Sequence, residues 1–264
     1  MFIKDKGQYV PVLACYVKQD GEYAKAESLS IKDDGEFLEL FRDLKPAVAT
    51  VYTSAQDEVQ RNVAVQASFH SKHDSLLIDW GDGTAKTLLT AKQTSVTHLY
   101  KYSTTMHQLT MLGRCKDLAV SGRALRSIDD FGYHQNRSFG LYCTHTSEPS
   151  TNLEILPEVL PKHITHLDYM FSYTDSLVDR IEHWDVSHVV SMNATFTNAR
   201  NIPDITLWDV SGVTSADSLF YNSTDFNQDL SLWYLPLINV RPVDFDANTP
   251  SWEKENRQPI FGSE

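Results

Sequence analysis

The last third of the chain repeats itself every 24 to 25 residues, in segments 164–187, 189–211 and 213–233. One such repeat buries too little apolar surface to offset the entropy of ordering its backbone, so neighbouring repeats must stack. Five positions are apolar in every repeat, and these residues are expected in a shared core: Ile164, Val189 and Val213; Leu167, Met192 and Ala216; Phe171, Phe196 and Phe220; Ile181, Ile205 and Leu230; Trp184, Trp208 and Trp233.

The first three core positions of each repeat fall at i, i+3 and i+7, a spacing that predicts a short helix. Ser187 and Ser211 stand just ahead of the second and third repeats as candidate N-caps. The later I/L-x-x-W element is too short for a helix and predicts an extended rung. Helix plus rung at this period is typical of an α/β solenoid. The tryptophans are expected to stack inside it with their indole N–H groups bonded to rung carbonyls, and an exposed ladder for sugars is the alternative.

A polar and aromatic loop follows the aligned Phe of each repeat, where solenoids commonly carry variable binding segments. If the array recognises a partner, we expect the contact at these residues: Tyr173, Thr174, Asp175, Asn198, Arg200, Asn201, Tyr221, Asn222, Thr224 and Asp225. Asp185 and Asp209 occupy equivalent repeat positions. This equivalence predicts that they hold turns, since paired acid and base chemistry needs two unlike environments.

The N-terminal segment contains a second repeat, in which a seven-residue phrase recurs at a spacing of fourteen as "IKDKGQY", "VKQDGEY" and "IKDDGEF". Asp-Gly at the centre of two copies predicts tight hairpins, with Ile3/Tyr9, Val17/Tyr23 and Ile31/Phe37 as cross-strand pairs. Isolated hairpins are marginally stable, so this segment must pack on something. We expect docking through Tyr9, Tyr23 and Phe37, and a plain β-meander under the next domain is the alternative.

Between the two repeats lie alternating, β-branched runs at residues 48–54, 62–70, 76–80, 95–100 and 106–113, which predict an immunoglobulin-like β-sandwich. The expected fold class is therefore mixed and β-rich, ending in a leucine-rich-repeat-like α/β solenoid. The expected domains are a hairpin docking segment (1–45), the sandwich (46–116), the solenoid (117–250) and a C-terminal tail (251–264).

The sandwich contains the words "IDWGDGT" at Ile78–Thr84 and "THLY" at 97–100. They resemble the polycystic-kidney-disease (PKD) domain family, in which W-G-D-G-T is followed by an H-x-Y element. Ser103, Thr104 and Thr105 stand where that family has G-x-Y, which leaves the last strand's start open. Physically, the Asp82 carboxylate can accept backbone N–H groups of the turn. A calcium site at Asp79 and Asp82 is the alternative, but two ligands fall short of the roughly six to eight that Ca²⁺ takes.

The long repeats carry "MF" at Met170-Phe171, "WDVS" at 184–187 and 208–211, and "FNQDLSLW" at 226–233. These words resemble the BspA-like leucine-rich repeat family of bacterial surface proteins and some phage virion proteins. The N-terminal hairpin phrases resemble the starts of some bacteriophage tail and fibre proteins. Together the resemblances imply adhesion or protein contact, and they supply no catalytic residue.

Charge and composition limit the kinds of partner that the chain is expected to bind. Asp and Glu number 35 against 23 Lys and Arg, a formal net charge of -12, which disfavours nucleic acid. No apolar run is long enough to cross a membrane. Three cysteines, Cys15, Cys115 and Cys143, cannot all pair, so we expect free thiols packed as small apolar groups. His163 and His166 could share a helix face as metal ligands, but no further ligand completes the set, and neither a metal nor a cofactor is expected.

These observations favour a non-enzymatic structural or receptor-binding component of a bacteriophage virion, assembled in the host cytoplasm and oligomeric within an assembly. Its expected partners are other virion proteins, through residues 1–45, and a protein or glycan of the host surface. The alternative is a bacterial cell-surface adhesin. The N-terminus lacks a signal-peptide pattern, which favours the virion. A tail-associated polysaccharide-degrading enzyme is a third hypothesis, which no isolated acid pair supports.

Overall fold

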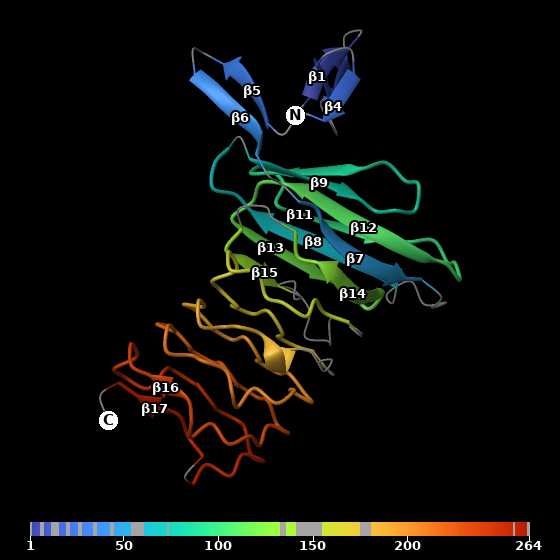
Figure 1. Ribbon diagram of the computed structural model, residues 1–264. Coiled ribbons are helices and arrows are strands. Elements are labelled where there is room, and N and C mark those ends of the chain that lie inside the picture. The colour runs from blue at the N-terminus through green and yellow to red at the C-terminus, as the bar shows by residue number, and fades with distance from the viewer. Residues whose placement is uncertain are drawn as a thin grey trace. The chain divides into compact units, whose positions relative to one another are not determined.

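A computed structural model describes residues 45–53, 61–72, 74–132, 136–140, 155–174, 181–255 and 257–262 in full, and only strand backbones within residues 2–42 (Figure 1). The chain divides into two compact units, Met1–Lys45 and Pro46–Glu264. Each unit is described by itself. The fold is β-rich, and the described residues contain no α-helix.

The first unit consists of three separate two-stranded antiparallel hairpins, as the repeated phrase predicts. Each hairpin has a two-residue connection, which is the length that tight hairpin turns favour. The pairs are β1 (Phe2–Asp5) with β2 (Gln8–Pro11), β3 (Tyr16–Gln19) with β4 (Glu22–Lys25), and β5 (Ser28–Asp33) with β6 (Glu36–Arg42).

The cross-strand pairs expected in these hairpins are wrong by one residue. Because the two-residue connection sets Asp5 opposite Gln8, Tyr9 pairs with Lys4 and Ile3 with Val10. The backbone register therefore does not pair Ile3 with Tyr9. The same register recurs in the other copies, as Lys18↔Tyr23, Val17↔Ala24, Lys32↔Phe37 and Ile31↔Leu38. The side chains of the proposed docking residues Tyr9, Tyr23 and Phe37 lie outside the described residues.

The second unit begins with two packed sheets. The five-stranded sheet has the order β10-β9-β12-β7-β14, and the four-stranded sheet has the order β11-β8-β13-β15. Their bounds are β7 (Ala47–Tyr52), β8 (Asn62–Ser68), β9 (Ser75–Asp79), β10 (Thr87–Thr90), β11 (Ser95–Leu99), β12 (Met106–Gly113), β13 (Asp117–Ser121), β14 (Leu125–Asp130) and β15 (Ser138–Gly140). All five runs predicted from alternation are strands.

Alternation explains the packing of these sheets. Every second side chain of β7 is buried, and β8 has the same period, so both strands turn an apolar face into one core. Trp80, directly after β9, is 1% exposed within that core. Cys115 is also buried, and burial together with the nearby Asp117 and Asp74 carboxylates raises the pKa of its thiol to about 12. Cys15 and Cys143 lie outside the described residues.

The sheets extend past the boundary expected at residue 116. β13 pairs with β8 and β14 pairs with β7, so residues that we assigned to the solenoid belong to the sheets. β13 also pairs with β15, and this pairing is parallel. Sequence alternation cannot show which distant strand a segment will join, because pairing depends on the tertiary arrangement.

The repeats contain turns where short helices were expected. Met170 N–H donates to the Leu167 carbonyl at 2.9 Å, and Ser172 N–H donates to Tyr169 at 3.3 Å, so i→i+3 turns overlap every two residues. Two residues four positions apart have a left-handed backbone in each repeat and in the segment that follows: Tyr169 and Tyr173, Ala194 and Asn198, Ser218 and Asn222, and Asp244 and Asn248. A left-handed residue ends a right-handed helix, and the i, i+3, i+7 spacing does not distinguish these turns from a helix. A three-residue 3₁₀ turn, η2 (Ile181–His183), lies ahead of Trp184.

The amide groups that do not close turns bond to the next repeat. Phe171 N–H donates to the Thr195 carbonyl at 2.9 Å, and Phe196 N–H donates to Leu219 at 2.9 Å. Phe220 N–H donates to Phe245 at 2.8 Å in the segment that follows the third repeat. Since these donors are used between repeats, they are not available for the i→i−4 bonds of an α-helix.

The stacked repeats continue the four-stranded sheet. Parallel bridges join Ser138 of β15 to His166, His166 to Ser191, and Ser191 to Ser215. At the far end, β16 (Tyr234–Leu235) pairs in parallel with β17 (Ile260–Phe261). Trp252 and Phe261, in the segment expected to be a C-terminal tail, are 5% and 3% exposed, so both side chains pack in the core.

Ser218 provides a test of the left-handed turns, because its φ is 56°. A Cβ in this conformation costs about 1 kcal/mol, which glycine avoids. We expect Ser218→Gly to be about 1 kcal/mol more stable than Ser218→Ala in urea unfolding of the full chain. Ala199 is buried and its φ is not positive, so Ala199→Gly should instead be less stable than wild type. Equal losses for both glycine variants would contradict the turn assignment.

Candidate functional site

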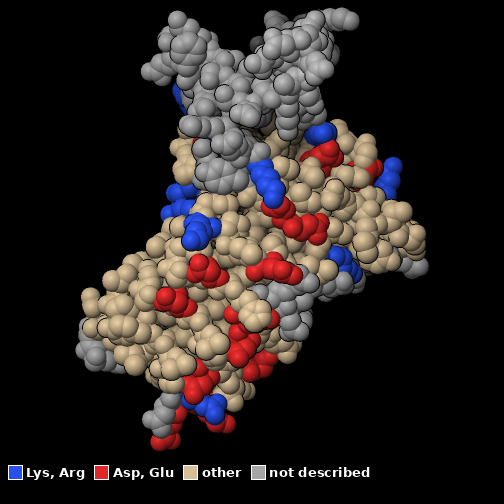
Figure 2. Space-filling view, in the orientation of Figure 1, with Lys and Arg blue, Asp and Glu red and all other residues tan. Residues whose placement is uncertain are grey.

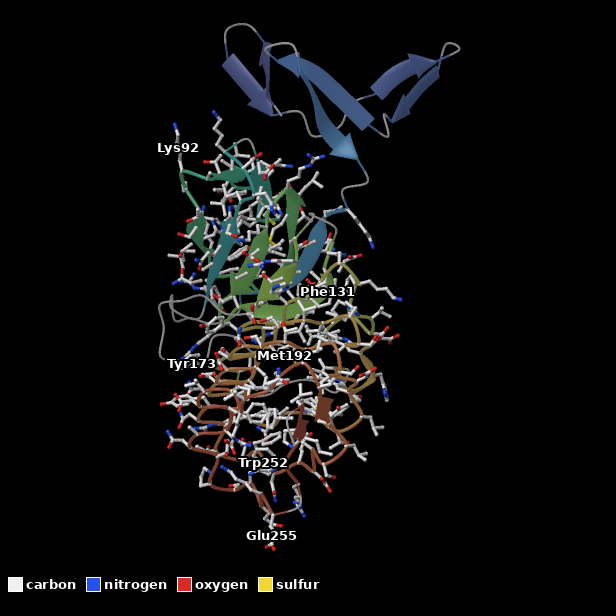
Figure 3. The ribbon with its side chains drawn as sticks, turned by 90° about the vertical axis from the view of Figure 1, so that its left-hand side faces the viewer. Lys92, Phe131, Tyr173, Met192, Trp252 and Glu255 are labelled. Atoms are coloured by element: carbon white, nitrogen blue, oxygen red, sulfur yellow. The ribbon has the colours of Figure 1, made fainter. Side chains whose placement is uncertain are left out.

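The loop residues that sequence singled out come together along one edge of the stacked repeats. Tyr173 N–H donates to Thr197 at 2.9 Å, Asn198 N–H to Tyr221 at 2.8 Å, and Asn222 N–H to Ala247 at 2.8 Å. Figure 3 shows Tyr173 at this margin, while Met192 and Trp252, which are 1% and 5% exposed, lie further inside the repeats. We call this surface the loop edge, formed by residues 173, 197–201, 221–225 and 247–248.

The predicted residues differ in exposure along the loop edge. Arg200, Asn201, Thr224 and Asp225 are exposed, and Tyr173, Asn198, Tyr221 and Asn222 are half-buried. Thr174 is fully buried, and its hydroxyl donates to the Phe171 carbonyl at 2.7 Å. It is therefore unsuited to binding a partner. Asp175 lies outside the described residues.

Hydrogen bonds between repeats hold this edge in place. The Asn222 side-chain amide donates to the Asn198 carboxamide oxygen one repeat earlier. Asn201 N–H donates to the Asp225 carboxylate at 2.8 Å. Asn198, Asn201 and Asn222 have φ values of 54°, 50° and 57°, a conformation that asparagine tolerates better than most residues. The edge is thus a rigid row of amide, hydroxyl and charged groups.

The tryptophans lie inside, in register, as predicted. Trp184, Trp208 and Trp233 are 3%, 4% and 1% exposed. Their indole N–H groups donate to the carbonyls of Pro157, Ile181 and Ile205 at 3.0, 2.9 and 3.1 Å. Each tryptophan therefore satisfies a carbonyl of the preceding level, which excludes an exposed tryptophan ladder for sugars.

The aligned phenylalanines form a second stack. The rings of Phe171 and Phe196 are 5.5 Å apart, and those of Phe196 and Phe220 are 5.7 Å apart with an angle of 4° between their planes. Trp208 and Trp233 are stacked at 6.5 Å and 5°. Phe131, at the end of β14, contacts Trp184 at 5.8 Å, so the core of the sheets runs directly into the core of the repeats.

Asp185 and Asp209 hold turns, as their equivalent positions predict. Each carboxylate accepts the hydroxyl and the amide of the serine two residues later, with the hydroxyl at 2.6 Å. These hydrogen bonds from Ser187 and Ser211 lower the pKa of both carboxyl groups. Ser187 and Ser211 bond to these aspartates and do not cap a helix.

A third set of side chains, missed in the sequence, also links the levels. Asp168 accepts the Ser191 hydroxyl at 2.6 Å and Asn193 N–H at 2.8 Å. Asn193 does the same for Ser215 and Asp217, at 2.7 and 2.8 Å. Asp168, Asn193 and Asp217 occupy the same position of successive repeats, as the last letter of "HLD", "SMN" and "SAD". A polar residue at this position of every repeat was the sequence signal that could have identified them.

The histidines do not assemble a metal site. His166 accepts from the Arg137 guanidinium at 3.2 Å, while burial, followed by the charge of His188, lowers the pKa of His163. In the described part of the chain, no group of three or more His, Cys, Asp or Glu side chains could hold an ion. The described residues likewise include no helix long and apolar enough to cross a membrane.

The WGDGT turn is held internally. Asp82 accepts the Thr84 amide and hydroxyl at 3.0 and 2.6 Å and contacts His98 Nε2 at 2.8 Å. His98 also stacks on Trp80 with ring centroids 4.5 Å apart. Gly81 has a φ of 74°, and a Cβ there would meet the Gln108 carbonyl oxygen. The carboxylate of Asp79, the other candidate calcium ligand, accepts Gly81 N–H and pairs with Lys86 at 2.7 Å, so both aspartates have partners within the turn.

Acidic side chains are scattered over the visible face of the second unit, with basic ones more sparse among them (Figure 2). This distribution gives no broad basic surface on that face and does not favour a phosphate-rich partner there.

Comparison with known proteins matches the repeat region to one family. Residues 147–253 match the family described as "Mycoplasma protein of unknown function, DUF285". The match covers less than half of the chain and includes all three aligned repeats. No curated protein and no solved structure matches the chain.

The indole hydrogen bonds give a direct prediction. Trp208→Phe removes the indole donor, so the buried Ile181 carbonyl keeps only the Trp184 N–H, and the smaller ring leaves a cavity. Together these changes should cost about 2 kcal/mol of unfolding free energy. The neighbouring Leu207 is 82% exposed, so Leu207→Ala should change stability by less than about 0.5 kcal/mol. Similar values for the two variants in urea unfolding would show that the indole bond contributes nothing.

The WGDGT turn predicts a dependence on pH. Although burial raises the pKa of Asp82, hydrogen bonds from Thr84 and His98 outweigh it and lower the pKa to about 2. A lowered pKa adds stability that is present above the unfolded value of about 3.9 and is lost as the pH falls through the folded value. The stability advantage of wild type over Asp82→Asn should therefore shrink between pH 4 and pH 2 in thermal unfolding. An advantage that stays constant over this range would contradict the assignment.

Proposed function

We propose that this protein is a non-enzymatic structural and receptor-binding component of a bacteriophage virion, which presents the loop edge to a partner. The observation that supports this function best is the loop edge itself, where exposed Arg200, Asn201, Thr224 and Asp225 are held at a fixed spacing by bonds between repeats. Side chains preordered in this way lose little entropy on binding, which favours recognition of another surface.

The proposed architecture follows from the same contacts. We take the stacked repeats to be a solenoid of the BspA-like type in which turns replace helices, and the two sheets to be a PKD-like, immunoglobulin-type domain. The parallel bridges from β15 through His166 and Ser191 support a domain that covers the first level of the solenoid and protects its edge.

The hairpins are proposed to dock the protein onto other virion proteins. In the strand register of each hairpin, an aromatic residue pairs with a lysine and two apolar residues pair at the next position. Three small hairpins without a common sheet gain stability by packing on a partner, which supports an oligomeric setting within an assembly.

A bacterial cell-surface adhesin is the second candidate. The matched family takes its description from Mycoplasma, a bacterial source, and a binding edge on stacked repeats suits either setting equally well. The two functions share the loop edge and differ in what residues 1–45 attach to.

Fractionation of a culture that produces the protein tests the proposal. Antibody raised against the full chain should detect it in gradient-purified phage particles, and a chain lacking residues 1–45 should be missing from them. Detection on the cell envelope alone would support the adhesin instead. Absence from both fractions would reject both functions.

A separate binding experiment tests the loop edge. Arg200→Ala combined with Asn201→Ala and Asp225→Ala should reduce binding of the full chain to host cells at least tenfold, while Leu207→Ala should leave it unchanged. Equal binding of the triple variant and wild type would show that the partner contacts another surface.

A further inference from the structure

The outward face of the four-stranded sheet carries a hollow that none of the contacts above explains. It has a volume of about 390 Å³, within the range of small-ligand sites, and it extends from β8, β13 and β15 to the first repeat. Its floor is made of small residues, among them Ser68, Ala119, Ser138 and Gly140. Arg137, Asp168 and Tyr169 lie at the side nearest the repeats.

The charges at the floor of the hollow cancel, because one carboxylate pairs with one guanidinium. Asp117 pairs with Arg137 Nε at 3.1 Å and accepts the hydroxyls of Ser68 and Ser138 at 2.7 and 2.9 Å. Burial raises the pKa of Asp117, but these three partners outweigh it and lower the pKa. With both of its oxygens engaged and its charge neutralised by Arg137, Asp117 offers little to a free cation or anion.

Unused hydrogen-bonding groups remain beside this pair. One oxygen of Asp168 accepts from Ser191 and Asn193, and none of the described residues donates to the other oxygen. Arg137 donates through Nε to Asp117 and through Nη1 to His166, and no described residue accepts from its Nη2. The lining of the hollow therefore includes both an acceptor and a donor, which is the combination that vicinal hydroxyl groups require.

Tyr169 adds a flat aromatic surface. Its side chain is 51% exposed, and its backbone is fixed by a bond from its N–H to the Asn193 carbonyl at 2.9 Å. An aromatic ring with one polar end suits a ligand that has both an apolar face and hydroxyl groups. A pyranose ring has that character, since its axial C–H bonds form an apolar face and its hydroxyls project from the rim.

The sheet edge beside the hollow is already covered. β15 is the last strand of its sheet, and its outer side is bridged to His166 of the first repeat. A peptide strand therefore finds no open edge to extend here, which leaves a compact ligand as the better fit.

We propose that this hollow binds one neutral saccharide unit of a surface glycan, with Tyr169 stacked on the sugar ring and Asp168 and Arg137 bonded to adjacent hydroxyls. The inference rests on the proposed receptor-binding function and names a ligand class for it, at a place distinct from the loop edge.

Saturation-transfer NMR with the full chain tests this site, with lactose, maltotriose, cellotriose and chitotriose as probes. At least one probe should bind, and Tyr169→Ala should weaken that binding at least tenfold. Tyr234→Ala is the matched control, because Tyr234 is 52% exposed at the other end of the repeats, and it should change affinity less than twofold. Asp168→Asn keeps an oxygen for Ser191 and should weaken binding between twofold and tenfold.

The possible outcomes separate this proposal from the proposed function. Thermal unfolding of each variant shows whether it folds, and a Tyr169→Ala chain that melts like wild type yet binds the sugar equally well overturns the site. Failure of all four probes to bind, or tighter binding of anionic sialyllactose than of lactose, also overturns it. If particles still contain the protein while no sugar binds, only the saccharide inference fails.

Discussion

Hydrogen bonds between residues about one repeat apart are the constraint on which the second unit depends. Alternate backbone amides of each repeat donate to the next one, as Phe171 does to Thr195 and Phe196 to Leu219. The indole of each aligned tryptophan donates in the opposite direction, toward an earlier level. Since a buried carbonyl without a donor costs about 1–3 kcal/mol, each level requires its neighbours to be in register.

This constraint also explains why the sheets and the repeats form one compact unit. The parallel pairing of β13 with β15 supplies the first row of backbone groups, and the bridges at His166, Ser191 and Ser215 continue it. Phe131 joins the two cores through its contact with Trp184. At the other end, Phe245 and Phe261 continue the aromatic contacts of Phe220. The Asp246 carboxylate pairs there with Arg241 and Lys254 at 3.0 and 2.6 Å.

A regular scaffold of this kind separates the residues that fold the protein from those free to bind. The tryptophans and phenylalanines are inside, and Asp185 and Asp209 are used in turns. The two places that we propose for recognition are the loop edge and the hollow beside β15, and hydrogen bonds across levels hold both. Recognition at either place would require little rearrangement, because the backbone positions are already set.

The amino-acid sequence by itself determined the repeat period, the buried positions and the inward tryptophans, because positions that are buried in every repeat are apolar at equal spacing along the chain. It also determined the three hairpins and the strands β7, β8, β9, β11 and β12, but not the short strand β10. Only the tertiary structure decided that the repeats are built from left-handed turns and that β13 and β14 join the sheets. It alone placed Tyr9 opposite Lys4 and brought Arg137 and Asp168 to the lining of one hollow. Those features depend on which distant backbone groups each segment contacts, and the spacing of apolar residues along the chain does not specify these contacts.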